Sequence, residues 1–258
     1  MMTVENRWRT SETSRSILAH YSYSLNNPVK YSDPSGHRLC EFATDYCPVG
    51  NSGYPPVAGI VFYLNAIGNL SEGLFQPSSD PNNDQGFYIN MAGKAVGINN
   101  VVHIPIFQGN VFESRIDMFL EMLDLSHEWT SFAVEEIGSY LADNPLEPNE
   151  RLILLGESGG GTIAIEMLSQ LAEDGISVDQ VIMRGSPLLE LFGNVERIDY
   201  ITSRFDYYDS LLIDMNPSDD SAIYRHRMDF IGHVPPDTQM VAQIGLLIYD
   251  LILEGASQ

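Results

Sequence analysis

Positive charge is scarce in this sequence. The 258 residues include 13 Lys+Arg against 35 Asp+Glu, which gives a formal net charge of -22 at pH 7. Such a surface repels the phosphate backbone of nucleic acids and is not attracted to anionic lipid headgroups. Nucleic-acid binding and electrostatic membrane binding are therefore disfavoured, and we interpret the acidity as a feature that favours solubility.

Cysteine is almost absent, since Cys40 and Cys47 are the only two. Neither has a histidine or a second cysteine at the spacing of a zinc finger, so no metal site is predicted around them. Both lie in a polar, turn-rich region ahead of the first convincing strand, which disfavours a catalytic thiol. A small loop disulfide and a pair of free thiols both fit the sequence.

The sequence also lacks a long hydrophobic run. No apolar stretch approaches the ~20 residues that a membrane-spanning helix needs. The start MMTVENRWRT has no apolar segment of the kind that secretory signal peptides carry. We therefore predict neither a membrane span nor a signal peptide in this chain. With 44% hydrophobic residues, the chain can build one well-filled domain with a short appendage.

The most informative stretch is residues 151–170, RLILLGESGGGTIAIEMLSQ. It opens with an apolar run at 152–155 that is typical of a buried parallel strand. Residues 156–160 then fit the pattern G-x-S-x-G, with Ser158 at its centre. Apolar residues recur beyond it at helical spacing: Ile163, Met167, Leu168 and Leu171. A strand, a tight turn with serine at its tip and a helix together predict a nucleophile elbow.

Short apolar runs and amphipathic stretches alternate along the chain from residue 59 onward. The predicted strands cover residues 59–64, 101–106, 152–155, 180–183, 197–202 and 228–231. The predicted helices cover residues 87–96, 113–125, 128–141 and 239–253, and a further one follows Ser158. This alternation predicts an α/β fold with a mainly parallel sheet and helices on both faces. In such sheets, functional side chains gather at the carboxyl ends of the strands.

A serine nucleophile needs a base, and histidine is the usual one. The chain has six: His20, His37, His103, His127, His226 and His233. His20 and His37 precede the α/β region. His103 lies inside a predicted strand and His127 at a predicted helix start, and for both we favour a structural role. Of the remaining two, we favour His233, which lies in a loop after the last predicted strand. His226 is flanked by two arginines, which should repel its protonated form.

The acid that orients the base should follow the strand predicted at 197–202. Asp206 is the first carboxylate after that strand and is flanked by aromatic residues. Asp209 lies three residues further along and is the alternative acid. Asp199 is a weaker candidate because it lies within the strand itself. We therefore favour Asp206 and keep Asp209 open.

The order Ser158, Asp206, His233 is the order of the catalytic triad in α/β-hydrolases. With the strand and helix pattern, it makes residues 57–255 resemble that superfamily. The resemblance implies an α/β-hydrolase fold with a minimal, mostly parallel sheet of about six strands flanked by helices. It also implies a serine esterase or lipase that works through an acyl-enzyme, with no metal and no organic cofactor.

The same resemblance implies where the oxyanion hole lies. In that superfamily one donor is the backbone N–H of the residue after the nucleophile, here Gly159. The second comes from the loop after the first core strand, so the candidates are the N–H groups of Ala66 and Ile67. Most members carry His-Gly in this loop where this chain has Asn65-Ala66, and the choice between the two donors stays open.

Residues 21–36, YSYSLNNPVKYSDPSG, resemble the end of the RHS repeat-associated core domain, whose tail runs Y-x-Y-x-x-N-N-P and then D-P-x-G. The resemblance implies that residues 1–50 are an RHS-core-like tail, which we expect to be an irregular arm. Residues 51–258 would then be the catalytic domain and the variable payload of a longer protein with an RHS shell. A secreted or extracellular location would follow from that context.

Three functions fit these patterns. The first is hydrolysis of carboxylic esters by an esterase or lipase acting on a small-molecule or lipid ester. The second is an RHS-associated effector or toxin that acts on lipids or proteins of a target cell. The third is a non-catalytic binding domain that has kept the fold. Residues 186–194 and 211–224 are candidate lid segments, and the acyl chain length stays open.

Overall fold

The computed structural model describes residues 57–66, 78–106, 128–186, 195–204, 222–231, 235 and 237–256. All of them fall within the compact unit Val57–Gln258. The predicted N-terminal arm and its boundary with the catalytic domain, the two cysteines and the helix predicted at 113–125 lie outside the described residues. The fold below is that of the described ranges.

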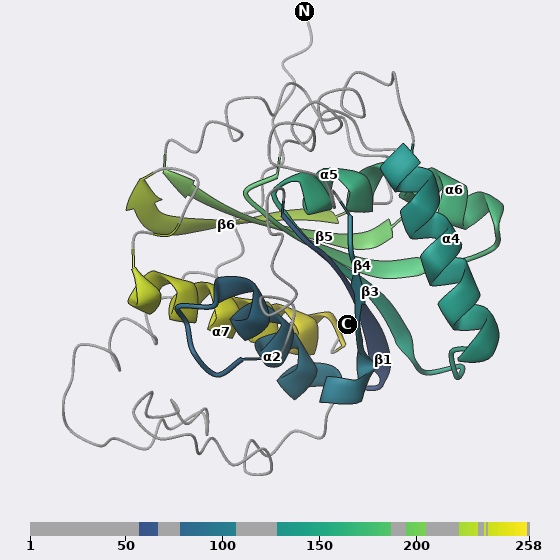
Figure 1. Ribbon diagram of the computed structural model, residues 1–258, viewed down its shortest axis with the longest axis horizontal. Helices are drawn as coiled ribbons and strands as arrows, with labels where there is room; N and C mark the ends of the chain where they lie inside the picture. The colour runs from purple at the N-terminus through teal and green to yellow at the C-terminus, as the bar shows by residue number, and fades with distance from the viewer. Residues whose placement is uncertain are drawn as a thin grey trace, which may run out of the picture. The chain divides into compact units, whose positions relative to one another are not determined.

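A single six-stranded sheet forms the centre of the fold (Figure 1). Its strands are β1 (Gly59–Leu64), β2 (Val101–Ile104), β3 (Arg151–Glu157), β4 (Val178–Arg184), β5 (Val195–Arg204) and β6 (Ala222–Ile231). The spatial order is β2-β1-β3-β4-β5-β6, and every neighbouring pair is parallel. The predicted α/β class with a sheet of about six strands is therefore confirmed.

Helices cover both faces of this sheet (Figure 1). They are α2 (Asp84–Val96), α4 (Glu128–Asp143), α5 (Gly159–Glu166), α6 (Leu168–Glu173) and α7 (Thr238–Gly255), with a short 3-10 turn, η2 (Ile98–Asn100). The pair α2 and α7 packs on one face, and α4, α5 and α6 pack on the other. No helix in the described ranges is long and apolar enough to cross a membrane.

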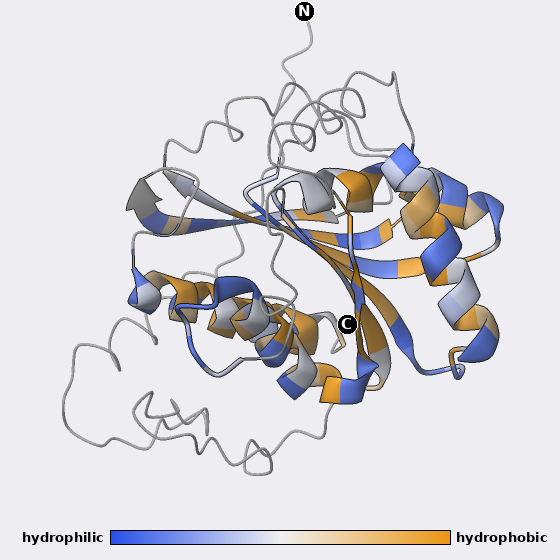
Figure 2. Ribbon diagram, in the orientation of Figure 1, coloured by the Kyte–Doolittle hydropathy of each residue, from blue (hydrophilic) through white to orange (hydrophobic). Residues whose placement is uncertain are grey.

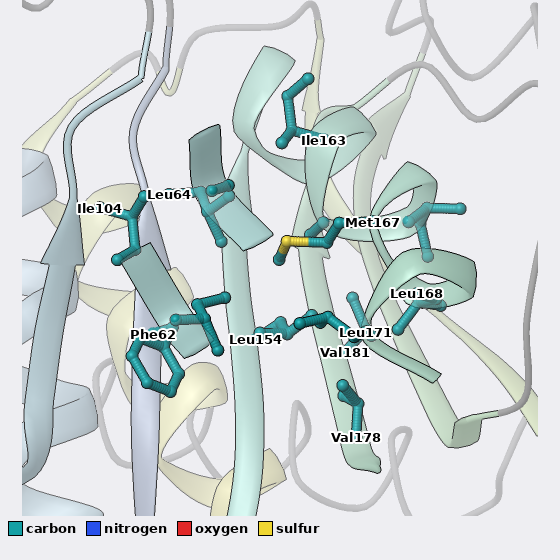
Figure 3. Close-up of a cluster of buried hydrophobic side chains, with 14 of the residues drawn as sticks. Phe62, Leu64, Ile104, Leu154, Ile163, Met167, Leu168, Leu171, Val178 and Val181 are labelled. Carbon is teal, nitrogen blue, oxygen red and sulfur yellow. The ribbon is translucent and has the colours of Figure 1, made fainter. Parts of the chain in front are cut away.

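The main hydrophobic core lies between the sheet and the face formed by α4, α5 and α6. Alternate strand residues such as Phe62, Leu154 and Val181 point into it and meet Ile163 and Met167 from the helical side (Figure 3). In Figure 2 the apolar residues are concentrated on the central strands, β6 is largely hydrophilic, and α4 carries both apolar and hydrophilic residues. Burial of these side chains holds α5 against the end of β3, which is where the serine lies.

Three of the differences between the predicted and the observed boundaries are informative. β2 ends at Ile104, before Pro105, because proline has no N–H to donate to the sheet. The helix expected after Ser158 is divided at Met167 into α5 and α6. β6 begins at Ala222, six residues before the predicted start at 228, because the polar residues 225–227 interrupt the apolar residues of the strand.

Candidate active site

Ser158 occupies the turn between β3 and α5. Its backbone has φ 52° and ψ -121°, and it is the one non-glycine with a positive φ in the part of the chain that the structure describes. A residue with a side chain avoids this region, and holding it there costs about 1–3 kcal/mol. The structure thus confirms the strand, turn and helix predicted from the sequence, with Ser158 at the strained position of the turn.

Three glycines make room for this turn. A Cβ on Gly156 would fall 2.5 Å from the Cα of Gly161, so the strand and the helix pass each other at backbone distance. A Cβ on Gly161 would collide with the side chain of Ser186, and one on Gly160 would collide with the carbonyl oxygen of Leu64. The run of glycines in the motif therefore reflects close packing around the serine.

Backbone hydrogen bonds hold the turn from both sides. The Ser158 N–H donates to the carbonyl of Arg184, at the end of β4, over 2.9 Å. The Ser158 carbonyl accepts from the N–H of Gly161 over 3.0 Å, within the first turn of α5. Gly159 is the first residue of that helix, where N–H groups have no partner within the helix and the helix dipole is positive. Its N–H is therefore suited to stabilising an oxyanion.

The loop after β1 lies directly against the start of α5. Gly160 is so close to this loop that a Cβ there would also fall 2.7 Å from the Asn65 carbonyl oxygen. The Asn65 side chain, which is 1% exposed, bridges to the end of β2. Its Nδ2 donates to the carbonyls of Ile106 (2.8 Å) and Ala66 (3.0 Å), and its Oδ1 accepts from the N–H of Ile106 (2.9 Å).

The Asn65 side chain thus joins the chain segments that follow β1 and β2. Ala66, one of the two candidate oxyanion donors, follows it in the described residues, and Ile67, the other, lies outside them.

His103, for which a structural role was expected, lies on β2 next to Asn65. Its Nε2 is 3.3 Å from Asn65 Oδ1, and its ring packs at 5.8 Å from that of Tyr63. Burial lowers the pKa of His103 to about 4, so the imidazole is neutral at neutral pH. A neutral ring with a proton on Nε2 donates to Asn65, which makes His103 a support for the loop after β1.

The predicted base and acids, His233, Asp206 and Asp209, lie outside the described residues. Their chain positions can still be compared with the strands. β5 ends at Arg204, shortly before Asp206, and β6 ends at Ile231, shortly before His233. Because all six strands are parallel, the chain leaves β5 and β6 at the same edge of the sheet as it leaves β3. Both triad partners stay predictions.

His226, which was set aside as the base, forms a buried pair with Asp199 inside the sheet. Its side chain is 2% exposed, and its Nε2 lies 2.8 Å from Asp199 Oδ1. Its two neighbouring arginines belong to the opposite face of the strand, because successive residues of a strand point to opposite faces. Asp199 is aligned with Ile182, which is in turn aligned with Leu155, three residues before Ser158.

Asp199 has further partners in the same buried network. It accepts hydrogen bonds from Arg197 Nε (2.6 Å) and Nη2 (2.9 Å) and from Gln180 Nε2 (2.6 Å). Burial by itself would raise the pKa of Asp199, but the hydrogen bonds from His226 and Arg197 hold it below its ordinary value. The network therefore keeps a charged carboxylate under α7, whose Glu254 also accepts from Arg197.

A second polar cluster, which the sequence analysis missed, lies immediately before the serine. Glu157 forms an ion pair with Arg184 and accepts from the Tyr63 hydroxyl over 3.2 Å, and the side chains of Glu157 and Arg184 are almost fully buried. Burial, and next the Glu157 charge, raise the pKa of Tyr63, so its hydroxyl stays protonated as a donor. In the sequence, Glu157 follows the strand predicted at 152–155 by two residues and Arg184 directly follows the strand predicted at 180–183, but no local pattern pairs the two.

Within the described ranges, no group of three His, Cys, Asp or Glu side chains is placed to hold a metal ion. The described part of the site thus consists of a serine at a strained turn, a helix start beside it, and a loop fixed by Asn65. This arrangement is suited to attack by a hydroxyl on a carbonyl and to stabilisation of the resulting oxyanion.

Comparisons with known proteins give no close relative. No protein-family model and no curated protein matches the sequence. Among solved structures, the chain is similar to a proposed cell surface hydrolase from Lactobacillus plantarum (12% identity, 78% of this chain and 93% of that one, TM-score 0.49). It is also similar to a dienelactone hydrolase from Anabaena variabilis (14% identity, 77% and 88%, TM-score 0.49).

A third similar structure is a cutinase-like protein from Cryptococcus (15% identity, 78% of this chain and 96% of that one, TM-score 0.44). Likeness at this level does not transfer an activity. The structure itself shows an α/β fold, with a six-stranded parallel sheet and a serine turn at the end of β3.

Proposed function

We propose that this protein is a serine hydrolase that cleaves carboxylic esters, as an esterase or lipase does. The observation that carries the proposal is the backbone of Ser158, which is held at φ 52° between β3 and α5. A protein has no structural need to keep a serine in a conformation that glycine adopts without strain. Nucleophile elbows do need it, because the turn presents the hydroxyl at the carboxyl edge of the sheet.

In the proposed reaction, His233 takes the proton of the Ser158 hydroxyl while Oγ attacks the ester carbonyl carbon. The tetrahedral intermediate collapses to an acyl-enzyme, and the leaving alcohol receives that proton from His233. Water then attacks the acyl-enzyme with His233 as its base, which releases the carboxylic acid and restores the serine. Asp206, with Asp209 as the alternative, would hold the imidazole in the required tautomer.

Two backbone N–H groups would stabilise the oxyanion. Gly159 provides one at the start of α5, and Ala66 or Ile67 provides the other. Each donor is worth about 3 kcal/mol in the transition state. The contact between Gly160 and the loop after β1 supports this assignment, because it brings the loop next to the first turn of α5.

The test is turnover of chromogenic acyl esters by the wild type and by Ser158→Ala. We expect the substitution to lower kcat by about 10³-fold or more. Ser169→Ala is the matched control, since Ser169 is a half-buried serine on α6 and should retain full activity. Labelling by a fluorophosphonate should be lost in the first variant only. Ester hydrolysis that survives Ser158→Ala would overturn the proposal.

We also infer that the hydrolase is the payload of a longer protein with an RHS shell and acts as an effector on lipids or proteins of a target cell. The pattern at residues 21–36 supports this, and residues 1–50 would be the tail of the shell. Expression of the chain in a bacterium, with and without Ser158→Ala, tests the toxic role. Equal growth of the two cultures would argue against it.

A further inference from the structure

We propose that Asn65 is the positioning residue of the oxyanion hole. The inference rests on the proposed function, because it concerns how the second donor is held in place. Asn65 carries no reacting atom, and its carboxamide makes three hydrogen bonds to the backbone at the ends of β1 and β2. These bonds fix the loop in which the donor lies.

The orientation of the carboxamide is determined by its partners. Oδ1 accepts from a backbone N–H, that of Ile106, and Nδ2 donates to two backbone carbonyls, those of Ile106 and Ala66. His103 adds a polar contact with Oδ1, at 3.3 Å from its Nε2. The opposite orientation would place an N–H₂ against an N–H and an oxygen against two oxygens, so the side chain has one satisfied arrangement.

This arrangement constrains both candidate donors. The C=O and the N–H of a trans peptide point in opposite directions. The hydrogen bond from Asn65 Nδ2 to the Ala66 carbonyl therefore constrains the peptide that follows Ala66. The Ala66 N–H belongs to the preceding peptide, whose residue Asn65 is itself held by the hydrogen bonds between its side chain and Ile106. The direction of either N–H group therefore depends on the Asn65 side chain.

Asn65→Asp is the informative substitution, because it keeps the shape of the side chain but turns the Nδ2 donor into an acceptor facing two carbonyls. The loop should shift, and a displacement of about 1 Å at a catalytic group lowers the rate by about 10²-fold. We expect kcat for an acyl ester to fall by about that factor with little change in KM, since the donor acts in the transition state.

A thionoester separates a positioning role from a general loss of structure. Its developing charge lies on sulfur, which is a weak hydrogen-bond acceptor and depends less on the oxyanion hole. Asn65→Asp should therefore slow thionoester turnover much less than turnover of the matching ester. Asn144→Asp is the control, since Asn144 donates to the Tyr140 carbonyl at the exposed end of α4 and should change neither rate.

His103→Phe provides a second variant in case Asn65→Asp does not fold. The variant keeps an aromatic ring beside Tyr63 but removes the Nε2 near Asn65 Oδ1. We therefore expect a smaller loss of turnover than in Asn65→Asp, and again a larger loss for the ester than for the thionoester. Equal losses for the two substrates, or no loss, would overturn the inference while the hydrolase proposal stands. If the wild type hydrolyses neither substrate, the proposed function fails, and the inference fails with it.

Discussion

Glu157 and Arg184 form a buried ion pair between the last residues of β3 and β4, where their Cα atoms are register partners. Each is directly connected to the serine turn, since Glu157 precedes Ser158 in the chain and the Arg184 carbonyl accepts from the Ser158 N–H. Burial opposes the charge on Arg184, but the Glu157 carboxylate holds its pKa above the ordinary value. The pair therefore stays ionised beneath the elbow.

Breaking this pair should destabilise the protein strongly. Glu157→Gln leaves the Arg184 guanidinium buried without its counter-charge, which costs about 3–5 kcal/mol. The measurement is the free energy of unfolding in urea. In the double variant Glu157→Gln, Arg184→Gln we expect a loss clearly smaller than the sum of the two single losses, because the uncompensated charge is gone. Additive losses would show that the two side chains do not depend on each other.

We expect the substitution of glycine by alanine to have opposite effects at Gly160 on α5 and at Gly138 on α4. Gly160→Ala would drive a Cβ into the Leu64 carbonyl and push α5 away from the loop after β1. We expect lower stability and a large loss of ester turnover, because the loop and the serine must stay together.

The matched control for Gly160→Ala is Gly138→Ala, in the middle of α4, where nothing lies within 4 Å of the added carbon. Alanine is the better helix former, so this variant should be more stable by about 0.5–1 kcal/mol with unchanged turnover. Thermal unfolding measures the stability of the two variants, and ester assays measure their turnover. Equal behaviour of the two variants would contradict the packing seen around Gly160.

We expect the contribution of Asp199 to the free energy of unfolding to decrease at acid pH. Its folded-state pKa lies below the ordinary value of 3.8 because His226 and Arg197 donate to it. A carboxylate whose pKa is lowered by folding stabilises the fold at pH values above its unfolded-state pKa. That contribution is lost as the pH falls through the folded-state pKa. The stability difference between wild type and Asp199→Asn should therefore be largest near neutral pH and shrink below about pH 4.

Urea unfolding at several pH values measures that difference for Asp199. Asp143→Asn, at the exposed end of α4, provides the comparison and should show a much smaller difference. A difference for Asp199→Asn that stays constant down to acid pH would show that the carboxylate is not held ionised by its partners.

The sheet and the serine turn could be predicted because their signals are local. Buried parallel strands appear as short apolar runs, and the elbow is a continuous motif around Ser158. The prediction for β6 is too short because β6 is an edge strand with a polar middle, residues 225–227, in which Arg227 is exposed. An edge strand has one neighbour only and does not need a continuous apolar run.

The polar pairs of the sheet could not be predicted in the same way. Glu157 and Arg184 meet only because β3 and β4 adopt one register, and Asp199 and His226 meet only because β5 and β6 do. A shift of one residue would send either partner to the opposite face. That register depends on the packing of the whole sheet, so no local pattern around either residue indicates its partner. The hydrogen bonds of Asn65 have the same origin, since they join two strand ends that are distant in sequence.

The choice of base and acid can be decided by four substitutions in the ester assay. His233→Gln should lower kcat by about 10³-fold or more, since Ser158 would lose the group that takes its proton. Asp206→Asn should cost about 10⁴-fold if it holds the imidazole tautomer, and Asp209→Asn should then have little effect. The reverse result for the two aspartates would assign the acid to Asp209.

His226→Gln is the control for the base, because His226 is paired with Asp199 within the sheet. Its substitution should lower stability while the folded protein keeps its turnover, and a loss of turnover as large as that of His233→Gln would assign the base to His226 instead.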